Sequence, residues 1–520
     1  MTDTQSMTRL PKGWTLAKLG EVCKDPQYGW TTSAVAEGEL HLLRTTDITS
    51  GNVDWRSVPY CKEEPIDAEK YLLEDGDVVI SRAGSVGFSH LIRNPEHSIF
   101  ASYLIRFKPL IDERYFAFFL KSPLYWQAIS ERKIGIALAN VNASKLRQIL
   151  MPIAPLDEQI RIVGQVEEFF ACLDAGVEEL RKVRAQLKRY RQAVLKYAFE
   201  GKLTEKWQKN HRDLIEPASQ LVNSIIKGNL AEWENDQLLQ VKKSRQDQKN
   251  HLLKKKHKQP LSPSTSTQAG LPEYWAWVTA DQLFWSITSG SRGWAKYYSE
   301  EGAFFVRVGD LSHDTISIDL KSAQHVNPPD GAELRRTRVS SGDILISITA
   351  DIGRIALVPI GIGEAYINQH VALAKSVSLF SHSYLAWFLL GPIGQKQLTG
   401  LQYGVTKAGL GLDDIRRVNI PLAPLVEQYE IVEEIERRLS VLTEAEEVIE
   451  QDLKRANSLR QSILRTAFEG RLVPQDPEDE PADKLLERIR EERAKSMGEK
   501  NTNKRRKDKP KQLELSTYVK

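Results

Sequence analysis

The sequence predicts an α+β protein built by internal duplication, in which two mixed globular parts are each followed by a long helix. Three observations support this prediction. A block of 54 residues occurs twice, apolar residues follow a heptad pattern in each copy of that block, and short β-type runs precede each copy. An internal repeat determines how the whole chain is organised, so it is stronger evidence for the fold than any single motif.

The duplication is visible without gaps over the long block. Residues 151–204 and 420–473 share 19 identities over 54 positions. Weaker similarity extends outward, because HLLRTTDI (41–48) matches FFVRVGDL (304–311) and EDGDVVISRAGSVG (74–87) matches SSGDILISITADIG (340–353). The repeated unit has about 260 residues, far more than the ~20–50 residues of a solenoid repeat. The chain is therefore predicted to contain one large unit twice.

Composition excludes several classes of protein. The 520 residues carry Lys+Arg 72 against Asp+Glu 69, a net charge of +3, which excludes a strongly basic coat for nucleic acid. The three cysteines lie far apart, so neither a disulfide framework nor a Cys-rich zinc site is expected. No secretory signal and no apolar run of about 18 residues is present. The expected compartment is the cytoplasm.

The globular parts, about 10–150 and 271–419, are predicted to be α+β rather than alternating βαβα. Gly, Pro, Asn and Asp clusters separate their β-type runs, as is typical of strands. The clearest of these runs are residues 77–82, 102–107, 343–348 and 370–375. Residues 114–129 and 383–398 are each predicted to form one amphipathic helix.

The repeated block predicts a long helix in each copy. Pro155 and Pro424 stand just ahead of the helices, where proline is common. Gly201 and Gly470 follow the last helical residues, where glycine often ends a helix. About 40 residues at ~1.5 Å each give a length of roughly 60 Å. Apolar residues follow a 4-3-4-3 register, interrupted by Arg184 and Arg191, at Val166, Phe170, Leu173, Val177, Leu180, Leu187 and Val194, and at Ile435, Leu439, Leu442, Ile449, Leu453, Ala456, Ile463 and Ala467.

Such a register indicates a coiled coil. The simplest partner for each helix is the other copy in the same chain, which predicts an intramolecular antiparallel coiled coil with pseudo-twofold symmetry. The alternative is that each apolar stripe belongs to an isolated core helix.

The expected organisation places a first globular domain at 1–150, the first long helix at 151–204, and a helix with a charged linker at 205–270. A second globular domain follows at 271–419, then the second long helix at 420–473 and a helix with a basic tail at 474–520. Shorter helices are expected at 217–233 and 481–494. The tract 242–268 is predicted to be a flexible linker and 499–512 a disordered tail, which could add sequence-independent phosphate affinity.

No motif for catalysis is present. The sequence lacks a phosphate-binding P-loop, an H-E-x-x-H or paired C-x-x-C metal motif, and a G-x-S-x-G elbow. Asn327-Pro328-Pro329-Asp330 resembles the Asn-Pro-Pro-aromatic motif of amino-methylating DNA methyltransferases, but Asp330 cannot stack on a flipped base, and a turn is expected there. His41, His90 and His370 are expected at structural positions. What remains is recognition by two similar domains, each able to engage a separate groove of DNA.

The motifs resemble those of the specificity subunits of type I restriction-modification systems. The similarity extends from Leu10 to about Arg493. Its markers occur twice in the same order, as Pro-Leu-x-Glu-Gln at 155–159 and 424–428, Ala-Phe-Glu-Gly-(Lys/Arg)-Leu at 198–203 and 467–472, and Gly-Asp-(Val/Ile)-(Val/Leu)-Ile-Ser from Gly76 and from Gly342.

The resemblance implies a non-catalytic subunit whose two target-recognition domains read the halves of a bipartite double-stranded DNA site. It implies that the coiled coil sets the spacer and that two modification subunits dock on the helices. Those subunits would carry S-adenosylmethionine and methylate adenine, and restriction subunits would bring ATP and Mg²⁺. This chain itself is expected to hold no cofactor. The alternatives are a self-contained DNA methyltransferase and a coiled-coil scaffold that binds no DNA.

Loop residues of types that suit DNA bases are the candidate contacts. They are Tyr28, Trp30, Thr31, Arg44, Thr45, Arg82 and Ser85 in the first domain, and Ser291, Arg292, Trp294, Lys296, Arg307 and Thr349 in the second. The alternative is that Arg44 with Asp47 and Arg307 with Asp310 form internal structural pairs. Residues 1–150 carry 18 basic and 18 acidic residues, and 271–420 carry 13 and 14. We therefore expect tight DNA binding to depend on the modification subunits.

Overall fold

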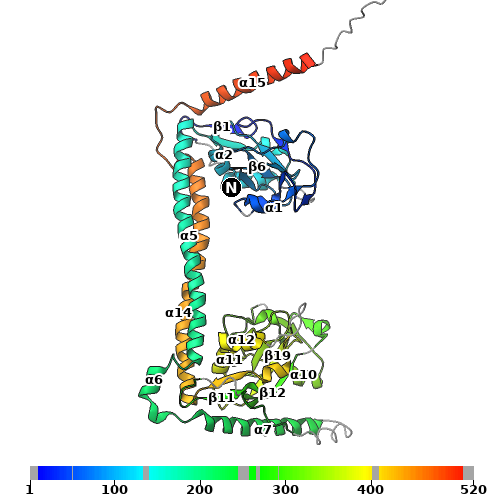
Figure 1. Cartoon of the computed structure of the whole chain (residues 1–520), viewed down its shortest axis with the longest axis vertical. Coiled ribbons are helices and arrows are strands. Elements are labelled where there is room, and N and C mark those ends of the chain that lie inside the picture. The colour runs from blue at the N-terminus through cyan, green and yellow to red at the C-terminus, as the bar shows by residue number, and fades with distance from the viewer. Residues whose placement is uncertain are drawn as a thin grey trace, which may run out of the picture. The chain divides into compact units, whose positions relative to one another are not determined.

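The chain divides into two compact units, each with one globular domain (Figure 1). The computed structural model describes residues 10–49, 51–132, 140–243, 257–264, 270–290, 292–321, 323–400 and 409–507. One unit comprises Met1–Arg181 with Glu450–Lys520, and the other comprises Lys182–Ile449. Each unit thus contains the beginning of one long helix and the end of the other.

The first unit contains ten strands among its described residues. They are β1 (Thr15–Lys18), β2 (Gln27–Tyr28), β3 (Ala34–Val35), β4 (His41–Leu43), β5 (Tyr60–Cys61), β6 (Val78–Ser81), β7 (Ser89–Leu91), β8 (Ser98–Phe100), β9 (Leu104–Phe107) and β10 (Leu150–Ile153). Its shorter helices are α1 (Thr45–Ile48), η2 (Trp55–Ser57), η3 (Ala68–Lys70), α2 (Glu113–Phe119), α3 (Pro123–Arg132), α4 (Ala143–Arg147) and α15 (Ala482–Lys507).

The second unit has the same number of strands within its described part. They are β11 (Ala276–Thr279), β12 (Phe284–Ser289), β13 (Tyr298–Ser299), β14 (Ala303–Val306), β15 (Gln324–Val326), β16 (Ile344–Ser347), β17 (Ile355–Leu357), β18 (Ala365–Ile367), β19 (Val371–Ser376) and β20 (Asn419–Leu422). Its shorter helices are α6 (Glu205–Asn210), η4 (Arg212–Leu214), α7 (Ala218–Lys243), α9 (Ala280–Leu283), η6 (Trp294–Tyr297), η7 (Val308–Asp310), α10 (Ala332–Thr337), α11 (His382–Leu390), α12 (Pro392–Gly400) and α13 (Leu412–Arg416).

Sheet topology confirms the predicted duplication and the α+β class. The first domain has sheets β1-β10, β2-β9-β6-β7 and β3-β5-β4-β8, and the second has β11-β20, β12-β19-β16-β17 and β13-β15-β14-β18. The same parallel pair occurs in each, β4 with β8 and β14 with β18, and the other strand pairs are antiparallel. Two domains with this shared mixed topology are copies of one fold.

The long helices are α5 (Leu156–Phe199) and α14 (Leu425–Phe468), each of 44 residues. Both begin directly after the predicted proline and end just before the predicted glycine. Gly201 and Gly470 have φ of +72° and +68°, so they adopt the left-handed conformation that closes many helices. A Cβ on Gly201 would also lie 2.3 Å from Pro272, so glycine is needed there for space as well.

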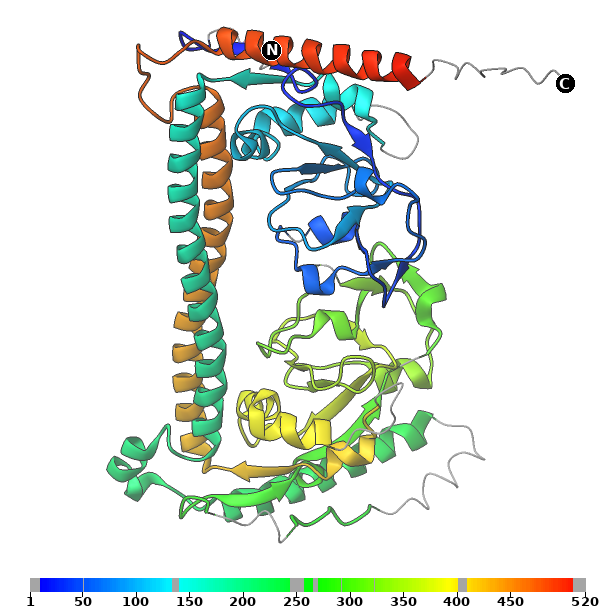
Figure 2. The ribbon, with the colours of Figure 1, turned by 45° about the horizontal axis from the view of Figure 1, so that its top comes forward.

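The helices pair antiparallel in each unit, as predicted (Figure 2). In the first unit the beginning of α5 shares a core with the end of α14, and in the second unit the end of α5 shares a core with the beginning of α14. Val166, Val194, Ile435, Leu439, Leu442 and Ile449 of the predicted seam are buried, as are Ala456 and Ala467. The other seam members are half-buried, namely Phe170, Leu173, Val177, Leu180, Leu187, Leu453 and Ile463.

The Glu-Gln pair of each Pro-Leu-x-Glu-Gln motif fastens a domain to its helix. Glu158 accepts a hydrogen bond from the indole of Trp14 at 2.9 Å, and Glu427 accepts one from Trp275 at the same distance. The Nε2 of Gln159 donates to Ala154 O at 2.8 Å, which ties the helix to the preceding strand β10. These motif residues are therefore structural.

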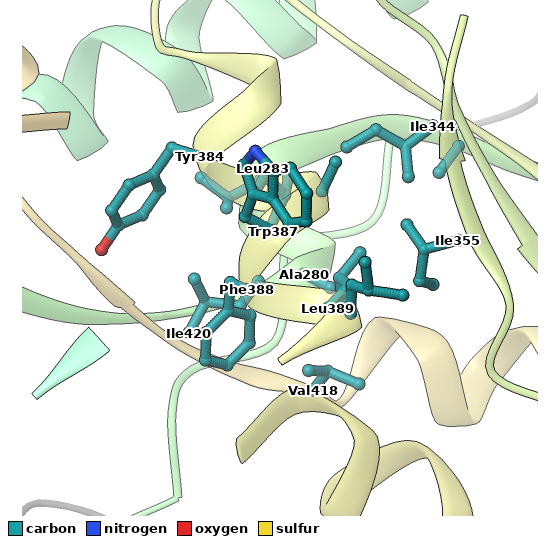
Figure 3. Close-up of a cluster of buried hydrophobic side chains, with 14 of the residues drawn as sticks. Ala280, Leu283, Ile344, Ile355, Tyr384, Trp387, Phe388, Leu389, Val418 and Ile420 are labelled. Carbon is teal, nitrogen blue, oxygen red and sulfur yellow. The ribbon is translucent and has the colours of Figure 1, made fainter. Parts of the chain in front are cut away.

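The phenylalanine of each Ala-Phe-Glu-Gly motif enters a domain core. Phe199 lies 5.1 Å from Tyr384 and 5.3 Å from Phe388, both on α11, between ring centres. Phe468 makes the equivalent contact with Tyr115 at 5.0 Å. Figure 3 shows the second-domain core around Tyr384 and Phe388, which lie among the aliphatic side chains of neighbouring strands and helices. Burying such rings contributes roughly 1.5–3 kcal/mol each.

The predicted single helices 114–129 and 383–398 are wrong, because each is two helices. The first breaks between α2 and α3, where Pro123 begins the second segment, and the second breaks between α11 and α12 at Pro392. A proline inside a helix removes a backbone donor and clashes with the carbonyl four residues earlier. The apolar periodicity continued through the break and hid it.

The charged extensions also differ from expectation. Helices α7 and α15 extend to Lys243 and Lys507, well beyond the predicted ends, because Glu, Lys, Arg and Gln favour helix even without an apolar stripe. Within the predicted linker, Leu261 N donates to Asp281 at 3.0 Å and Leu261 O accepts from Thr279 Oγ1 at 2.8 Å. This part is therefore anchored to the second domain. Residues 244–256, 265–269 and 508–520 of the predicted linker and tail lie outside the described residues.

Candidate nucleic-acid interface

Four loops meet at equivalent strand ends in each domain. The first loop cluster comprises residues 28–31, 43–45, 82–85 and 101–103, joined by the hydrogen bonds Trp30 N–Phe100 O, Ala101 N–Leu43 O and Arg82 N–Tyr103 O. The second loop cluster comprises 289–290 with 292, 306–308, 348–351 and 368–370, joined by Gly290 N–Val371 O, Asn368 N–Val306 O and Ile348 N–His370 O. The duplication thus places the same arrangement of loops on each domain.

A glycine allows the loops to approach closely in both clusters. A Cβ on Gly29 would lie 2.2 Å from Phe100 O, and one on Gly290 would lie 2.0 Å from Asn368 O. No side chain fits at such distances from a backbone carbonyl. Tyr28, which precedes Gly29, is thereby held beside β9, where it pairs with Ile105.

Arg82 and Tyr28 form the centre of the first loop cluster. The guanidinium of Arg82 lies 5.1 Å from the centre of the Tyr28 ring, within the range of a cation–π interaction. Its Nε is buried and has no hydrogen-bond partner among the described residues. The Tyr28 side chain is exposed, and its hydroxyl accepts a hydrogen bond from Ala143 N at 3.0 Å. An oriented arginine beside an exposed ring suits guanine recognition.

The other first-domain candidates differ in how exposed they are and in whether their polar groups already have partners. Thr31 is exposed, and Thr45 and Ser85 are half-buried. Trp30 donates its indole N–H to Glu63 O at 2.8 Å and packs edge-on against Tyr71. Because these contacts use the indole to fix the loop, we interpret Trp30 as a structural residue that positions its neighbours.

Arg44 and Arg307 both pair with an aspartate three residues later, as the structural alternative proposed. Arg44 donates to the Asp47 carboxylate from Nε at 3.0 Å and from Nη2 at 2.8 Å, and this hydrogen bonding raises the pKa of Arg44. Arg307 is held more loosely, with its Nε 3.9 Å from Asp310 Oδ2. Burial raises the pKa of Asp310, although the backbone N–H and charge of Arg307 partly offset that effect. Both arginines keep more than a third of their side chains exposed.

The second loop cluster contains a hydrogen-bonded histidine. Thr349 Oγ1 and His370 Nδ1 are hydrogen-bonded, and Gln369 Nε2 donates to His370 Nε2 at 2.9 Å. Ala350 has φ of +67°, where Gly84 of the first domain has +75°. A non-glycine residue in this conformation is strained, as is common at functional sites.

The remaining second-domain candidates differ in how deeply their side chains are buried. Arg292 and Lys296 are exposed, and the Lys296 ammonium lies 4.9 Å from the centre of the Tyr297 ring. Trp294 is only 5% exposed and stacks on Phe305, so its ring is part of a core and not a surface contact. Ser291 lies outside the described residues.

Three residues at these clusters were not among the contacts predicted from the sequence. Tyr103 is 61% exposed in the first cluster, and His370 occupies the equivalent position just before β19. Arg336 donates through Nη1 to Ser289 O, beside Gly290. Tyr103 and His370 could have been found from their shared place directly before the strand runs 104–107 and 371–376. Arg336 carries no comparable sequence signal; it lies on α10, which follows β15 as the shorter η3 follows β5 in the first domain.

The Gly-Asp motifs have a structural role. Gly76 and Gly342 have φ of +85° and +86°. Asp77 and Asp343 follow them, and each accepts a hydrogen bond from the backbone three residues earlier. Burial raises the pKa of both carboxyls, and the cations Arg106 and Lys375 offset this. The motif therefore builds a turn before β6 and β16.

Neither a metal site nor a membrane helix emerges from the described part of the chain. Within it, no three His, Cys, Asp or Glu side chains are grouped as metal ligands. Among these same residues, no helix is long and apolar enough to cross a membrane. At Asn327-Pro328-Pro329-Asp330 the chain is irregular and bends at Asp330 before α10.

Comparison with known proteins identifies the family. A family described as type I restriction modification DNA specificity domain matches residues 11–183 and 334–455. This is more than half of the chain, so the chain belongs to that family. It is a DNA recognition subunit of a type I restriction-modification system and not one of the catalytic subunits.

Two relatives and one solved structure give the extent of the similarity. The EcoBI specificity subunit of Escherichia coli is 26% identical over 473 residues, covering 89% of this chain and 88% of its own. The EcoKI specificity subunit of Escherichia coli strain K12 is 25% identical over 525 residues, covering 96% and 100%. A structure concerning assembly and conformational transition of the type I R-M system superposes with a TM-score of 0.59 at 18% identity, covering 89% of this chain and 100% of that one. That structure supports the fold alone.

Proposed function

We propose that the first and second loop clusters each read one half of a bipartite DNA target. The observation that supports this is the repetition of the same four-loop arrangement, with exposed polar or aromatic residues on each copy. Loops on a rigid scaffold are the usual location of recognition residues. In the first cluster we assign base contacts to Arg82, Tyr28 and Thr31, and in the second to Arg292, Arg307 and Thr349.

Exchange of one domain tests this assignment. Residues 25–145 would be replaced by the equivalent segment of a relative, and the variant co-expressed with the modification subunit. Sequencing of methylated adenines across the genome then reports both half-sites. We expect one half-site to change and the other to remain as in the natural protein. A change in both half-sites would contradict the modular assignment.

We further propose that two modification subunits bind the equivalent helix starts. Leu156 and Ile160 are 38% and 50% exposed on α5, and Leu425 and Tyr429 are 36% and 58% exposed on α14. Each pair is spaced by four residues, which places it on one helix face. Exposed apolar residues repeated at equivalent positions suit two copies of one partner.

The partners would supply what this chain lacks. In this proposal the modification subunits carry S-adenosylmethionine, and restriction subunits carry ATP and Mg²⁺. Both globular domains are close to neutral in net charge, whereas phosphate neutralisation supplies most non-specific DNA affinity. We therefore expect the isolated chain to bind DNA weakly at physiological salt, and the complex to work on DNA in the cytoplasm. Tight, sequence-specific binding by the isolated chain would contradict this dependence.

A further inference from the structure

Arg191 places a charge inside the apolar seam of the coiled coil. Its side chain is only 7% exposed, between the seam residues Leu187 and Val194. The Nη2 atom donates to Glu446 Oε2 on α14 at 2.8 Å. Burial of an ion pair costs desolvation energy and adds little stability compared with a well-packed apolar pair. The seam therefore contains a polar contact that coiled-coil stability alone does not require.

The same guanidinium reaches the second domain. The Nη1 atom of Arg191 donates to the backbone oxygen of Asp314 at 2.9 Å, and the Asp314 carboxylate lies 3.9 Å from it. Arginine suits this position because its planar group can donate to two acceptors in different directions, which a lysine ammonium does less rigidly. Arg191 thus connects three parts of the unit, α5, α14 and the loop at 311–319.

That loop is fastened in turn to the second loop cluster. His313 Nε2 is hydrogen-bonded to Asp351 Oδ1 at 2.8 Å. Arg354 donates from Nε to Asp351 at 2.7 Å and from Nη1 to Leu311 O at 2.7 Å. Asp351 is in the second loop cluster, two residues after Thr349. A continuous set of polar contacts therefore joins the seam to the proposed reading loops.

The equivalent arginine of the other copy has different partners. Arg460 occupies the position of Arg191 in the repeat, but it donates to Asp174 and lies 5.7 Å from the centre of the Phe170 ring. Both partners belong to α5 and not to a domain loop. The two arginines therefore form a matched pair for comparison.

We propose that Arg191 is a positioning residue for recognition by the second domain, through the contacts from Arg191 to Asp314 and from the 311–319 loop to Asp351. This inference rests on the proposed reading function of the second loop cluster. Loss of the guanidinium would remove the hydrogen bond that joins α5 to the 311–319 loop and loosen the loops that contact bases. Discrimination would then fall in the half-site read by the second domain and not in the other.

The test uses the full chain in complex with its modification subunits. After the target of the natural complex is mapped, methylation rates are measured on duplexes with single base changes in each half-site. The second-domain half-site is the one that does not change when residues 25–145 are exchanged. For Arg191→Met we expect the cognate-to-changed rate ratio to fall about tenfold in that half-site, as loss of a charged hydrogen bond implies. The other half-site should keep its ratio.

Three variants separate positioning from coiled-coil stability. Glu446→Gln removes the seam ion pair but leaves the bond from Arg191 to Asp314, so both ratios should be retained. Arg460→Met removes the matched arginine and should leave the second-domain half-site unchanged. Arg191→Lys keeps the positive charge, so this variant should fold even if Arg191→Met does not. Its cognate-to-changed rate ratio should fall in the same half-site, but by less than in Arg191→Met.

The outcomes distinguish the two proposals. Equal losses in both half-sites for Arg191→Met, or natural ratios for both Arg191→Met and Arg191→Lys, would overturn the positioning role. A change of both half-sites on exchange of residues 25–145 would instead overturn the proposed function on which it rests.

Discussion

Trp275 donates its indole N–H to Glu427, a carboxylate that is itself 1% exposed at the beginning of α14. Thr204 Oγ1 and Gln208 Nε2 donate to the same carboxylate at 2.7 and 2.5 Å. One side chain thus joins the second domain and the start of α14 to the segment after α5, which contains Thr204 and α6. Burial raises the pKa of Glu427, and the hydrogen bonds from Thr204, Gln208 and Trp275 offset that rise.

Glu427→Ala should destabilise the second unit by about 3 kcal/mol, because two buried donors and one half-buried donor lose their acceptor. Denaturant unfolding of the full chain, followed by tryptophan fluorescence, measures this loss. Glu433→Ala on the exposed face of α14 is the control and should change stability by less than about 0.5 kcal/mol. Similar losses for the two variants would show that Glu427 does not join these elements.

The sequence predicted the architecture because its strongest signals are periodic and repeated. Heptads, capping proline and glycine, and the gapless block located both long helices to within a few residues. The break before Pro123 was missed because apolar residues continue across it. The family motifs could be identified in the sequence, but the structural role of their residues could not. A pattern such as Pro-Leu-x-Glu-Gln does not show that its glutamate contacts Trp14, which is 144 positions away.

The candidate contacts were harder to predict, because they depend on which loops meet. Trp294 and Arg292 are two residues apart in one segment, yet the ring of Trp294 is in a core and Arg292 is exposed. His370 appeared structural in the sequence and lies in the second loop cluster beside Thr349. Pairings of this kind arise from long-range strand register, which single-sequence patterns do not encode.

Arg82→Met should weaken recognition of one half-site. The substitution retains the bulk over Tyr28 but removes every donor, and one bidentate contact to a base contributes about 1–3 kcal/mol of discrimination. Methylation of duplexes with single base changes by the complex would show a loss of about tenfold or more at one position. Arg56→Met, on an exposed side chain outside the loop cluster, is the control. Unaltered discrimination in Arg82→Met would remove Arg82 from the proposed contacts.

Charge on the exposed helix faces should prevent assembly. Ile160→Asp and Tyr429→Asp place a carboxylate on each proposed docking face without touching the seam, so the fold should be retained. Size-exclusion chromatography with light scattering should show loss of one modification subunit for each single variant and of both for the double variant. Val183→Asp, on an exposed position of α5 outside those faces, serves as the control. Full assembly by the double variant would place the docking surface elsewhere.

Longer helices should lengthen the spacer between half-sites. Arg181 and Glu450 occupy equivalent positions in the two copies, and seven residues inserted after each preserve the heptad register. Seven residues add about 10 Å of helix, which corresponds to roughly 3 base pairs. Genome-wide mapping of methylated adenines reads the spacer directly. The same seven residues placed between Lys243 and His257 should leave it unchanged, and an unchanged spacer in the helix variant would reject the proposed role of helix length.

Acid should destabilise the first unit through His90 on β7. Burial, aided by the charge of Lys121, lowers the pKa of His90 from 6.5 to about 4 in the folded protein. Since the folded state binds this proton less tightly than the unfolded chain, the stability from the neutral ring is fully present above pH 6.5. It is lost as the pH falls from 6.5 towards 4, by up to about 3 kcal/mol.

His90→Gln removes this titration, so its free energy of unfolding should fall less steeply over the same pH range than that of the natural chain. Carboxylates titrate near the lower limit in both proteins and cancel in the difference. His97→Gln is the matched control because His97 is exposed on the same domain, and its pH profile should follow that of the natural chain. Parallel profiles for His90→Gln and the natural chain would show that His90 is protonated in the folded protein as readily as in the unfolded chain.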